Sequence, residues 1–313
     1  MIAFGPVPSR RLGRSLGVNN IPPKTCSYAC TYCQLGNPLA MQADRSAFYG
    51  ADAVVDSVHD KLSSLEKKTE RIDYVAFVPD GEPTLDIDLA SEIRFLSSLG
   101  TPVAVITNGS LLCRADVRWA LQAADWVSVK VDAVEEPVWR RVDRPHRSLR
   151  LPAILDGIGA FAAEFPGQLV TETMLVHGIN DGESQLRALA RVLERVAPRT
   201  AYLSVPTRPP AEAWVSPPDD DTLNRAFQVV AERVGNVELL IGYEGDAFSL
   251  TGDVRKDLLA ITAVHPMRRR AVETLLTKAG APWRLVDELV EAGLLVASPY
   301  GGHTYYVRRV KRQ

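Results

Sequence analysis

The sequence predicts an α/β fold, an open partial (β/α)6 barrel followed by a small C-terminal domain with the outline of a winged helix. Up to about residue 251, short apolar runs rich in β-branched residues alternate with amphipathic helical stretches, which is typical of βα units around a parallel sheet. This alternation stops after about residue 252. Since 313 residues are also many for one compact unit, we predict two domains, 1–251 and 252–313.

Six βα units account for the first domain. Strands are expected near residues 15–21, 72–78, 102–107, 126–132, 168–176 and 200–205, with one more near 237–241. Helices with apolar residues at spacings of three and four are expected near 52–66, 86–99, 114–123, 149–164, 183–196 and 219–233. Six units are fewer than the eight that close a barrel, so the barrel should stay open.

Two helices and a hairpin make up the second domain. The helices are expected over 268–278 and 283–291, because Gly280 is a stop signal and Pro282 a start signal between them. The apolar and aromatic residues of 294–307 surround a glycine pair, which predicts a β-hairpin. Helix, turn, helix and hairpin together give the outline of a winged helix.

The composition predicts a globular protein of the cytoplasm. Hydrophobic residues make up 46% of the chain and charged residues 24%, which argues against disorder. No run of about 18 apolar residues and no signal-peptide pattern is found, so no membrane partner is expected. The net charge of −2 gives no overall attraction to nucleic acid, although basic residues cluster at 8–14 and 308–312.

Three of the four cysteines, Cys26, Cys30 and Cys33, lie within eight positions of one another. In a reducing compartment such clustering indicates metal binding rather than disulfides. Three thiolates can hold three irons of a cubane cluster and leave the fourth iron open. Two alternatives remain, a zinc site completed by a distant His and a thiol redox loop built on Cys30 and Cys33. Cys113 stands alone and is expected to be a buried structural thiol.

The Cys-x3-Cys-x2-Cys spacing, with Tyr32 before the last cysteine, resembles the cluster motif of the radical S-adenosylmethionine (SAM) superfamily. The resemblance implies an enzyme with a [4Fe–4S] cluster on Cys26, Cys30 and Cys33 and with SAM as second cofactor. It implies reductive cleavage of SAM to a 5′-deoxyadenosyl radical that acts on a substrate the sequence does not identify. A reductant such as a flavodoxin or ferredoxin would then be a partner.

Polar residues at the strand ends offer a SAM pocket, since ligands of parallel βα folds bind there. Gly81 and Glu82 follow the second strand and resemble the Gly-Gly-Glu loop for the SAM amino group, with Asp80 in place of the first glycine. Strand alternation sends Ser128, Lys130 and Asp132 to one face. The expected cofactor-binding residues are Gly81, Glu82, Thr84, Asn108, Ser128, Lys130, Glu172 and Thr207, and the expected catalytic residues are Lys130 and Asp132. The alternative is an ion pair that lines the barrel, between Lys130 and Asp132 or Glu172.

Three sequence segments, 5–13, 81–85 and 206–210, resemble those of a prokaryotic radical SAM family grouped with the wyosine tRNA-modification synthases. Those synthases are understood to use a second cluster held by cysteines ahead of the radical SAM motif. No cysteine precedes Cys26, so the wyosine reaction is not carried over. We expect residues 252–313 to contact an RNA or peptide substrate, and the alternative function is a non-catalytic iron–sulfur sensor that binds DNA through the winged helix.

Overall fold

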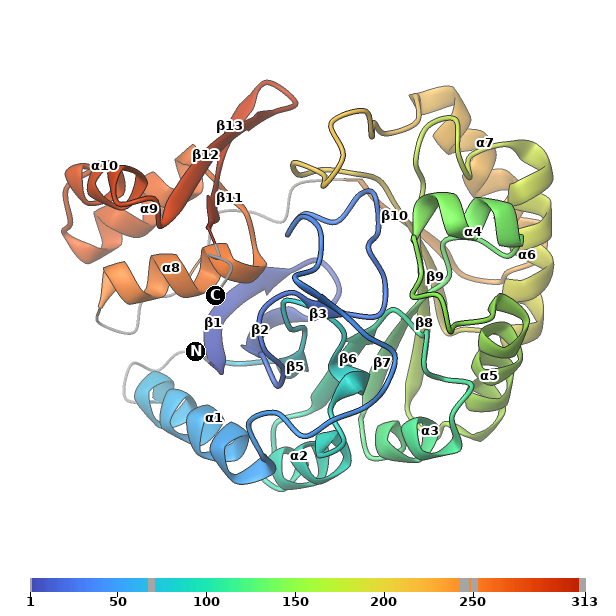
Figure 1. The fold of residues 1–313 in the computed structure, drawn as a ribbon, viewed down its shortest axis with the longest axis horizontal. Coiled ribbons are helices and arrows are strands. Elements are labelled where there is room, and N and C mark those ends of the chain that lie inside the picture. The colour runs from blue at the N-terminus through green and yellow to red at the C-terminus, as the bar shows by residue number, and fades with distance from the viewer. Residues whose placement is uncertain (1, 67–70, 242–247, 249–252, 310–313) are drawn as a thin grey trace.

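The computed structural model describes residues 2–66, 71–241, 248 and 253–309. Its centre is an eight-stranded sheet with the strand order β1-β2-β5-β6-β7-β8-β9-β10 (Figure 1). The strands are β1 (Ala3–Ser9), β2 (Gly13–Val18), β5 (Tyr74–Phe77), β6 (Val103–Thr107), β7 (Trp126–Lys130), β8 (Gln168–Met174), β9 (Thr200–Ser204) and β10 (Val237–Leu240). Only β1 and β2 are antiparallel; every other neighbouring pair in this sheet is parallel.

Helices pack along the outer side of this curved sheet (Figure 1). They are α1 (Ala51–Glu66), α2 (Leu89–Ser97), α3 (Ala115–Leu121), α5 (Leu151–Glu164), α6 (Glu183–Val196) and α7 (Asp220–Ala231). All six correspond to predicted helices, and the further strand predicted near 237–241 is confirmed as β10. Within the described residues β1 and β10 lie at opposite edges of the sheet, so the barrel is open as predicted. No helix in the described ranges has the length and apolar character needed to span a bilayer.

A strand and a helix of the first 251 residues, β1 and α4, show why some elements were not predicted. Strand β1 contains Pro6 and Pro8, which argue against a strand because proline cannot donate a ladder hydrogen bond. The structure places β1 at the edge of the sheet, where that loss is tolerated. Helix α4 (Glu136–Val142) has only seven residues, too few to show a clear helical period.

The turn between β1 and β2 fills the lower part of the barrel. Leu12 packs there against Trp126 and small inward-facing residues such as Ala76 and Ala104. Arg11 lies over the Trp126 ring, with its guanidinium carbon 5.8 Å from the ring centroid. The interior is therefore closed below by apolar side chains, and the polar inward-facing residues lie above them.

The C-terminal unit contains α8 (Val254–Val264), β11 (Met267–Arg268), α9 (Arg269–Ala279), α10 (Arg284–Glu291), β12 (Leu295–Tyr300) and β13 (His303–Arg308). The two predicted helices and the hairpin are confirmed, and Gly280 ends α9 in the left-handed conformation with φ 64°. Phe4 and Val7 of β1 share an apolar core with this unit. The predicted boundary at 251/252 and the basic residues from 310 onwards lie outside the described residues. The division into domains and the winged-helix assignment stay predictions.

The C-terminal unit also contacts the loop that follows β9. The Tyr300 hydroxyl donates to the Pro206 carbonyl at 3.0 Å, and the Tyr305 hydroxyl donates to the Thr207 carbonyl at 2.8 Å. Because this loop starts at the carboxyl end of β9, the hairpin lies next to the carboxyl ends of the sheet (Figure 1).

Two glycines of α5 give a matched test of the packing between helix and barrel. A Cβ on Gly157 would lie 2.4 Å from the Leu112 carbonyl oxygen, whereas a Cβ on Gly159 would meet nothing within 4 Å. We expect Gly157→Ala to destabilise the protein by about 1–3 kcal/mol through overpacking. Gly159→Ala should stabilise it by about 0.5–1 kcal/mol, because glycine is costly inside a helix. Urea unfolding of both variants measures this, and equal effects would contradict the close packing.

Candidate functional site

The cysteines lie on a long loop that starts after β2 and crosses the carboxyl ends of the strands (Figure 1). Its short strand β3 (Thr25–Cys26) pairs with β4 (Ala40–Met41), and Thr25 also bridges to Gly81 in the loop after β5. A Cβ on Gly81 would lie 1.9 Å from the Thr25 carbonyl oxygen, so only glycine permits this approach. The Glu82 amide donates to the same oxygen at 3.0 Å. The cysteine loop is thus fixed against the predicted SAM loop.

The other side of the cysteine loop is fixed by the segment after α4. The Ala29 amide donates to the Asp143 carbonyl at 3.0 Å, and the His146 amide donates to the Ser27 carbonyl at 2.8 Å. Arg144 adopts the left-handed conformation with φ 45°, which is unfavourable for a residue with a Cβ. These backbone bonds hold it there, so the segment is shaped to receive the loop.

The three thiols lie close enough together to interact electrostatically, and all lie near carboxyl groups. Burial, followed by the nearby Glu82 carboxylate, raises the pKa of the Cys26 thiol to about 12. Burial and then Asp143 raise the pKa of Cys30 well above its usual range, and its Sγ lies 3.5 Å from the Asp143 Oδ1. Burial also raises the pKa of Cys33. The thiols therefore stay protonated unless a cation compensates them.

This donor set fits an iron–sulfur cluster. Cluster irons bind thiolates, and their positive charge would offset the burial and the nearby carboxylates that raise the pKa of these thiols. In the described part of the chain no group of three or more His, Cys, Asp or Glu side chains could hold a metal ion. A cubane cluster does not need side chains that converge on one metal ion, because each thiolate binds its own iron.

Glu82 is a fully occupied hydrogen-bond acceptor. Its Oε1 accepts from the hydroxyls of Thr84 and Thr107, both at 2.6 Å, and its Oε2 accepts from the Asn108 amide at 2.7 Å. Glu82 and Thr84 are each only 1% exposed. These two predicted residues connect the loop after β5 to the end of β6. The Asn108 side chain instead reaches the cysteine loop, since its Nδ2 lies 2.9 Å from the Ser27 hydroxyl and 3.7 Å from the Cys26 Sγ.

Charged residues form a layer inside the barrel, above the apolar side chains of Leu12 and Trp126 that close it below. The Lys130 Nζ lies 3.0 Å from the Glu172 Oε1, and Arg11 pairs with the other Glu172 oxygen. Arg11 also donates to Ser128 at 3.3 Å, and Ser204 donates to Glu172 at 3.1 Å. The predicted alternative, an ion pair that lines the barrel, is thus present between Lys130 and Glu172.

Asp132 belongs to a neighbouring cluster of acids. Its Oδ1 accepts from the Met174 amide at 2.6 Å, and its other oxygen accepts from the Tyr32 hydroxyl. Burial raises the pKa of Asp132, and burial followed by the Asp132 charge raises the pKa of Asp143 well above its usual value. Tyr32 and Asp143 thus connect Asp132 to the cysteine loop.

A cavity of about 240 Å³ opens beside the cysteine loop. Predicted site residues in its wall are Cys33, Lys130, Glu172 and Thr207. Its remaining wall consists of Arg10, Arg11, Tyr32, Gln34, Leu35, Val78, Ile106, Met174, Ser204, Val205, Pro206, Arg208 and Leu240. The structure therefore brings residues of the cysteine loop, the inner strand faces and the loop after β9 around one space. Gly81, Glu82, Thr84, Asn108, Ser128 and Asp132 lie outside this wall.

Sequence reasoning missed Arg11, Tyr32 and Asp143 as site residues. Arg11 was assigned to a basic cluster and to the 5–13 segment of the family resemblance but not to the site, because the hairpin that turns it into the barrel was not predicted. Asp143 lies in an arginine-rich stretch, and nothing local indicates its burial or its contact with Cys30. The prediction that Cys113 is buried is wrong: it is exposed, with its Sγ 3.9 Å from the Ser110 carbonyl oxygen.

Comparison with known proteins gives matches in both sequence and structure. A family model described as the radical SAM superfamily matches residues 20–190. A UPF0026 protein of Methanocaldococcus jannaschii is 41% identical over 312 residues, which cover 99% of this chain and 97% of that protein.

Two solved structures share the fold at 16% identity. A radical SAM methyltransferase from Sphaerobacter thermophilus has a TM-score of 0.55, over 72% of this chain and 66% of the other. TYW1 with a lysine-pyruvate adduct bound has a TM-score of 0.52, over 70% of this chain and 74% of the other. At this identity the likeness concerns the fold alone.

The Glu172 ion pairs give a prediction of pH-dependent stability. Burial disfavours the Glu172 carboxylate, but Arg11 and Lys130 outweigh burial and lower its pKa from 4.5 to about 2. Because the pKa is lower in the folded than in the unfolded state, ionised Glu172 stabilises the fold at any pH above the unfolded-state pKa of about 4.5. This contribution is lost as the pH falls from about 4.5 towards 2. We expect Glu172→Gln to cost about 3 kcal/mol at pH 7. Denaturant unfolding of both proteins should show the difference shrinking below about pH 4.5, and a pH-independent difference would contradict the assignment.

Proposed function

The chain belongs to the radical SAM superfamily and to the UPF0026 family, and we propose that Cys26, Cys30 and Cys33 hold the [4Fe–4S] cluster beside the cavity described above. It is an enzyme whose cofactors are this cluster and SAM. When bound, the cluster supplies the electron that cleaves SAM to methionine and a 5′-deoxyadenosyl radical. The substrate would lie in the same cavity. We propose kinship with the wyosine tRNA-modification synthases as well, without carrying over their reaction.

One observation carries this proposal: Cys33 of the three-thiol loop lines the same cavity as the charged layer of Lys130 and Glu172. A cofactor in this cavity would therefore lie next to both the cluster and polar groups that can orient it. Burial and nearby carboxylates raise the pKa of Cys26 and Cys30, and a bound iron would offset both effects. Cys33 differs in that the Lys24 and Lys130 charges partly offset its burial.

We propose two kinds of role for the predicted SAM residues. Gly81, Asn108, Lys130, Glu172 and Thr207 would surround SAM, since they lie on the cavity wall or next to the cysteine loop. Ser128 is fully buried and accepts from Arg11, so it would act by positioning that side chain at the cavity. Glu82 and Thr84 would act as positioning residues, because their polar atoms already bond within the chain.

The predicted catalytic roles of Lys130 and Asp132 also belong to this proposal. The Lys130 ammonium lines the cavity, where Glu172 holds it charged, so it can bind an anionic group or hold a proton there. Asp132 would act through Tyr32, whose ring lines the cavity. A reductant such as a flavodoxin or ferredoxin would supply the electron.

A pair of cysteine variants tests the cluster assignment. The wild-type protein, reconstituted anaerobically and given SAM with a strong reductant, should form 5′-deoxyadenosine. Cys30→Ala should bind little iron and form none, because it removes one cluster ligand. Cys113→Ala should match the wild type, since Cys113 is exposed and lies on another loop. Iron and sulfide content, measured with 5′-deoxyadenosine, distinguishes loss of cluster from loss of activity.

Two outcomes would count against the proposal. Full iron content in Cys30→Ala would remove this residue from the ligand set. A wild-type protein that binds cluster and SAM but forms no 5′-deoxyadenosine would favour the iron–sulfur sensor that was the alternative prediction.

Asp80 offers a further contact for SAM. It replaces a glycine of the motif and is only 4% exposed, yet its Oδ2 has no hydrogen-bond partner among the described residues. Its charge influences the Cys33 thiol, which places it near the proposed cluster. A buried acceptor without a donor is costly, so a ligand that supplies the donor should bind well. We propose that this oxygen accepts a hydrogen bond from the SAM ammonium group.

Asp80→Asn tests this contact without a change of shape. We expect SAM affinity to fall about tenfold or more, because a hydrogen bond between charged groups is lost. Iron content should be kept, and the unfolding midpoint should not fall, since burial raises the pKa of Asp80 to about 7 and its charge therefore does not stabilise the fold. Isothermal titration with SAM measures the affinity, and Asp60→Asn, an exposed change on α1, is the matched control. Unchanged SAM affinity in Asp80→Asn would show that Asp80 does not bind the SAM ammonium group.

A further inference from the structure

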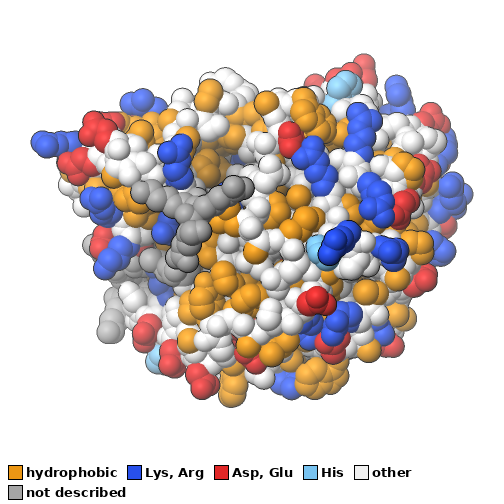
Figure 2. All heavy atoms as spheres, viewed as in Figure 1, with side chains coloured by type: hydrophobic (Ala, Val, Ile, Leu, Met, Phe, Trp, Pro, Cys, Tyr) orange, Lys and Arg blue, Asp and Glu red, His pale blue; other side chains and the backbone are white. Residues whose placement is uncertain are grey.

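An arginine-rich segment borders the cysteine loop. It runs from the end of α4 through the following turn and contains Arg140, Arg141, Arg144, Arg147 and Arg150. We call it the arginine rim. Figure 2 shows Lys and Arg side chains gathered over α4 and the neighbouring part of this face. Since the whole chain has a net charge of −2, this positive charge is local.

Much of the charge on the rim has no acidic partner. Arg140 pairs with Glu136 at 2.6 Å, and Arg144 pairs with Glu212. Among the described residues no carboxylate pairs with Arg141 or Arg147, both exposed. Arg150 is also exposed, and within the described ranges its guanidinium bonds only to backbone carbonyl oxygens. Asp143, the one acid inside the segment, is buried. The rim therefore presents positive charge to solvent.

The rim is fixed in place relative to the cavity of about 240 Å³ beside the cysteine loop, which we call the reaction cavity. The backbone of 142–146 bonds to 27–31 of the cysteine loop, which also contributes to the cavity wall through Tyr32 and Cys33. A molecule bound on the rim is thus held next to that cavity without any movement of the protein.

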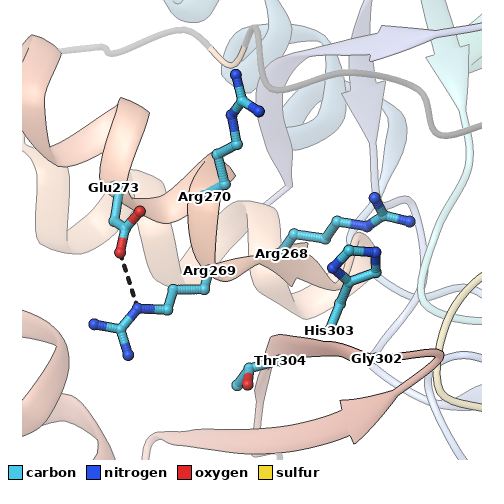
Figure 3. Close-up of a pocket in the computed structure, with 7 residues that line it drawn as sticks. All are labelled: Arg268, Arg269, Arg270, Glu273, Gly302, His303 and Thr304. Atoms are coloured by element: carbon cyan, nitrogen blue, oxygen red, sulfur yellow. Dashed lines mark hydrogen bonds and ion pairs between the residues drawn. The ribbon is translucent and has the colours of Figure 1, made fainter.

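A second positive surface lies on the C-terminal unit, across the cysteine loop from α4 (Figure 1). There a pocket of about 400 Å³ is lined by Arg268, Arg269, Arg270, Glu273, Gly302, His303 and Thr304. Figure 3 shows Arg268 and His303 together at one end of it, whereas Arg269 is turned towards Glu273.

A row of adjoining pockets connects this surface with the reaction cavity. Arg268 and His303 also line a pocket of about 350 Å³, to which Tyr300 and Tyr305 contribute aromatic rings. That pocket shares Pro206 and Thr207 with the reaction cavity. The cavity therefore lies between two positive surfaces, and one of them reaches it along an aromatic wall.

We propose that the arginine rim binds the phosphates of a nucleic acid strand whose nucleotide enters the reaction cavity, an inference that rests on the proposed function. A small anion could occupy one of the positive surfaces, but only a chain of anions can contact both. Arginine matches phosphate with two parallel hydrogen bonds. The cavity wall combines Lys130, Arg10 and Arg208 with the Tyr32 ring, as is suitable for a base and its phosphate.

Two variants of equal charge test the rim. In the rim variant Arg140, Arg141 and Arg147 are each changed to Gln. In the control variant Arg191, Arg195 and Arg199, exposed residues on and just after α6, are each changed to Gln. Fluorescence anisotropy measures binding of labelled single-stranded RNA and DNA of one sequence, about 20 nucleotides long. The holoenzyme is used without SAM or reductant, so binding is measured independently of SAM cleavage.

The rim variant should bind at least about tenfold more weakly than the wild type near 100 mM salt, and the control should bind like the wild type. Loss of three phosphate contacts should also lower the slope of log affinity against log salt by about 2. The RNA and DNA arms show which backbone is preferred. Equal weakening in both variants, or rim-dependent binding of polyglutamate or anionic vesicles with none of nucleic acid, would overturn the proposal. If the wild type binds through the rim but forms no 5′-deoxyadenosine, only the proposed function fails.

Discussion

The loop that carries the three cysteines has little regular secondary structure, so its shape depends on the backbone bonds made to it from both sides. On one side Thr25 lies against Gly81, at a distance that no side chain at position 81 would allow. On the other side the segment after α4 accepts the loop, with Arg144 held in a left-handed conformation. The first support follows strand β5, and the second follows helix α4, which itself comes after strand β7. The loop can therefore be rigid although little of it is helical or extended.

The interior of the barrel explains why charged groups are stable there. Leu12 of the β1–β2 turn packs against Trp126 of β7 and closes the lower half, so the layer above has an apolar floor. Charges in such a place are costly unless they are paired. Arg11 and Lys130 share Glu172, and the three form a network with a net positive charge. The same hairpin thus supplies Leu12 of the apolar floor and one of the cations, Arg11. An anionic ligand would neutralise the positive charge that Glu172 alone does not neutralise.

The parts of the fold that a local pattern determines could be predicted from the sequence. The central strands and outer helices follow from hydrophobic periodicity, and the cluster motif and the Gly81 loop from short spacings. The proline-bearing edge strand β1 could not be predicted, because its position in the sheet decides whether proline is tolerated there. Contacts over long separations were also missed, such as Arg11 with Glu172 and Cys30 with Asp143. For Cys113 burial was predicted where there is none, because its solitary position in the sequence indicates nothing about its exposure.

Arg208 joins the cysteine loop to the C-terminal unit. Its guanidinium donates to the Gln34 side-chain oxygen at 2.6 Å and lies 2.7 Å from the His265 ring nitrogen. Gln34 follows Cys33 and also donates to the Val264 carbonyl at 3.0 Å. Together with the bonds from the hairpin tyrosines to the loop after β9, these contacts make the C-terminal unit a support of the cavity wall. A ligand that shifted this unit would therefore act on Gln34, the residue next to Cys33, by two routes: directly through the bond to Val264, and indirectly through Arg208.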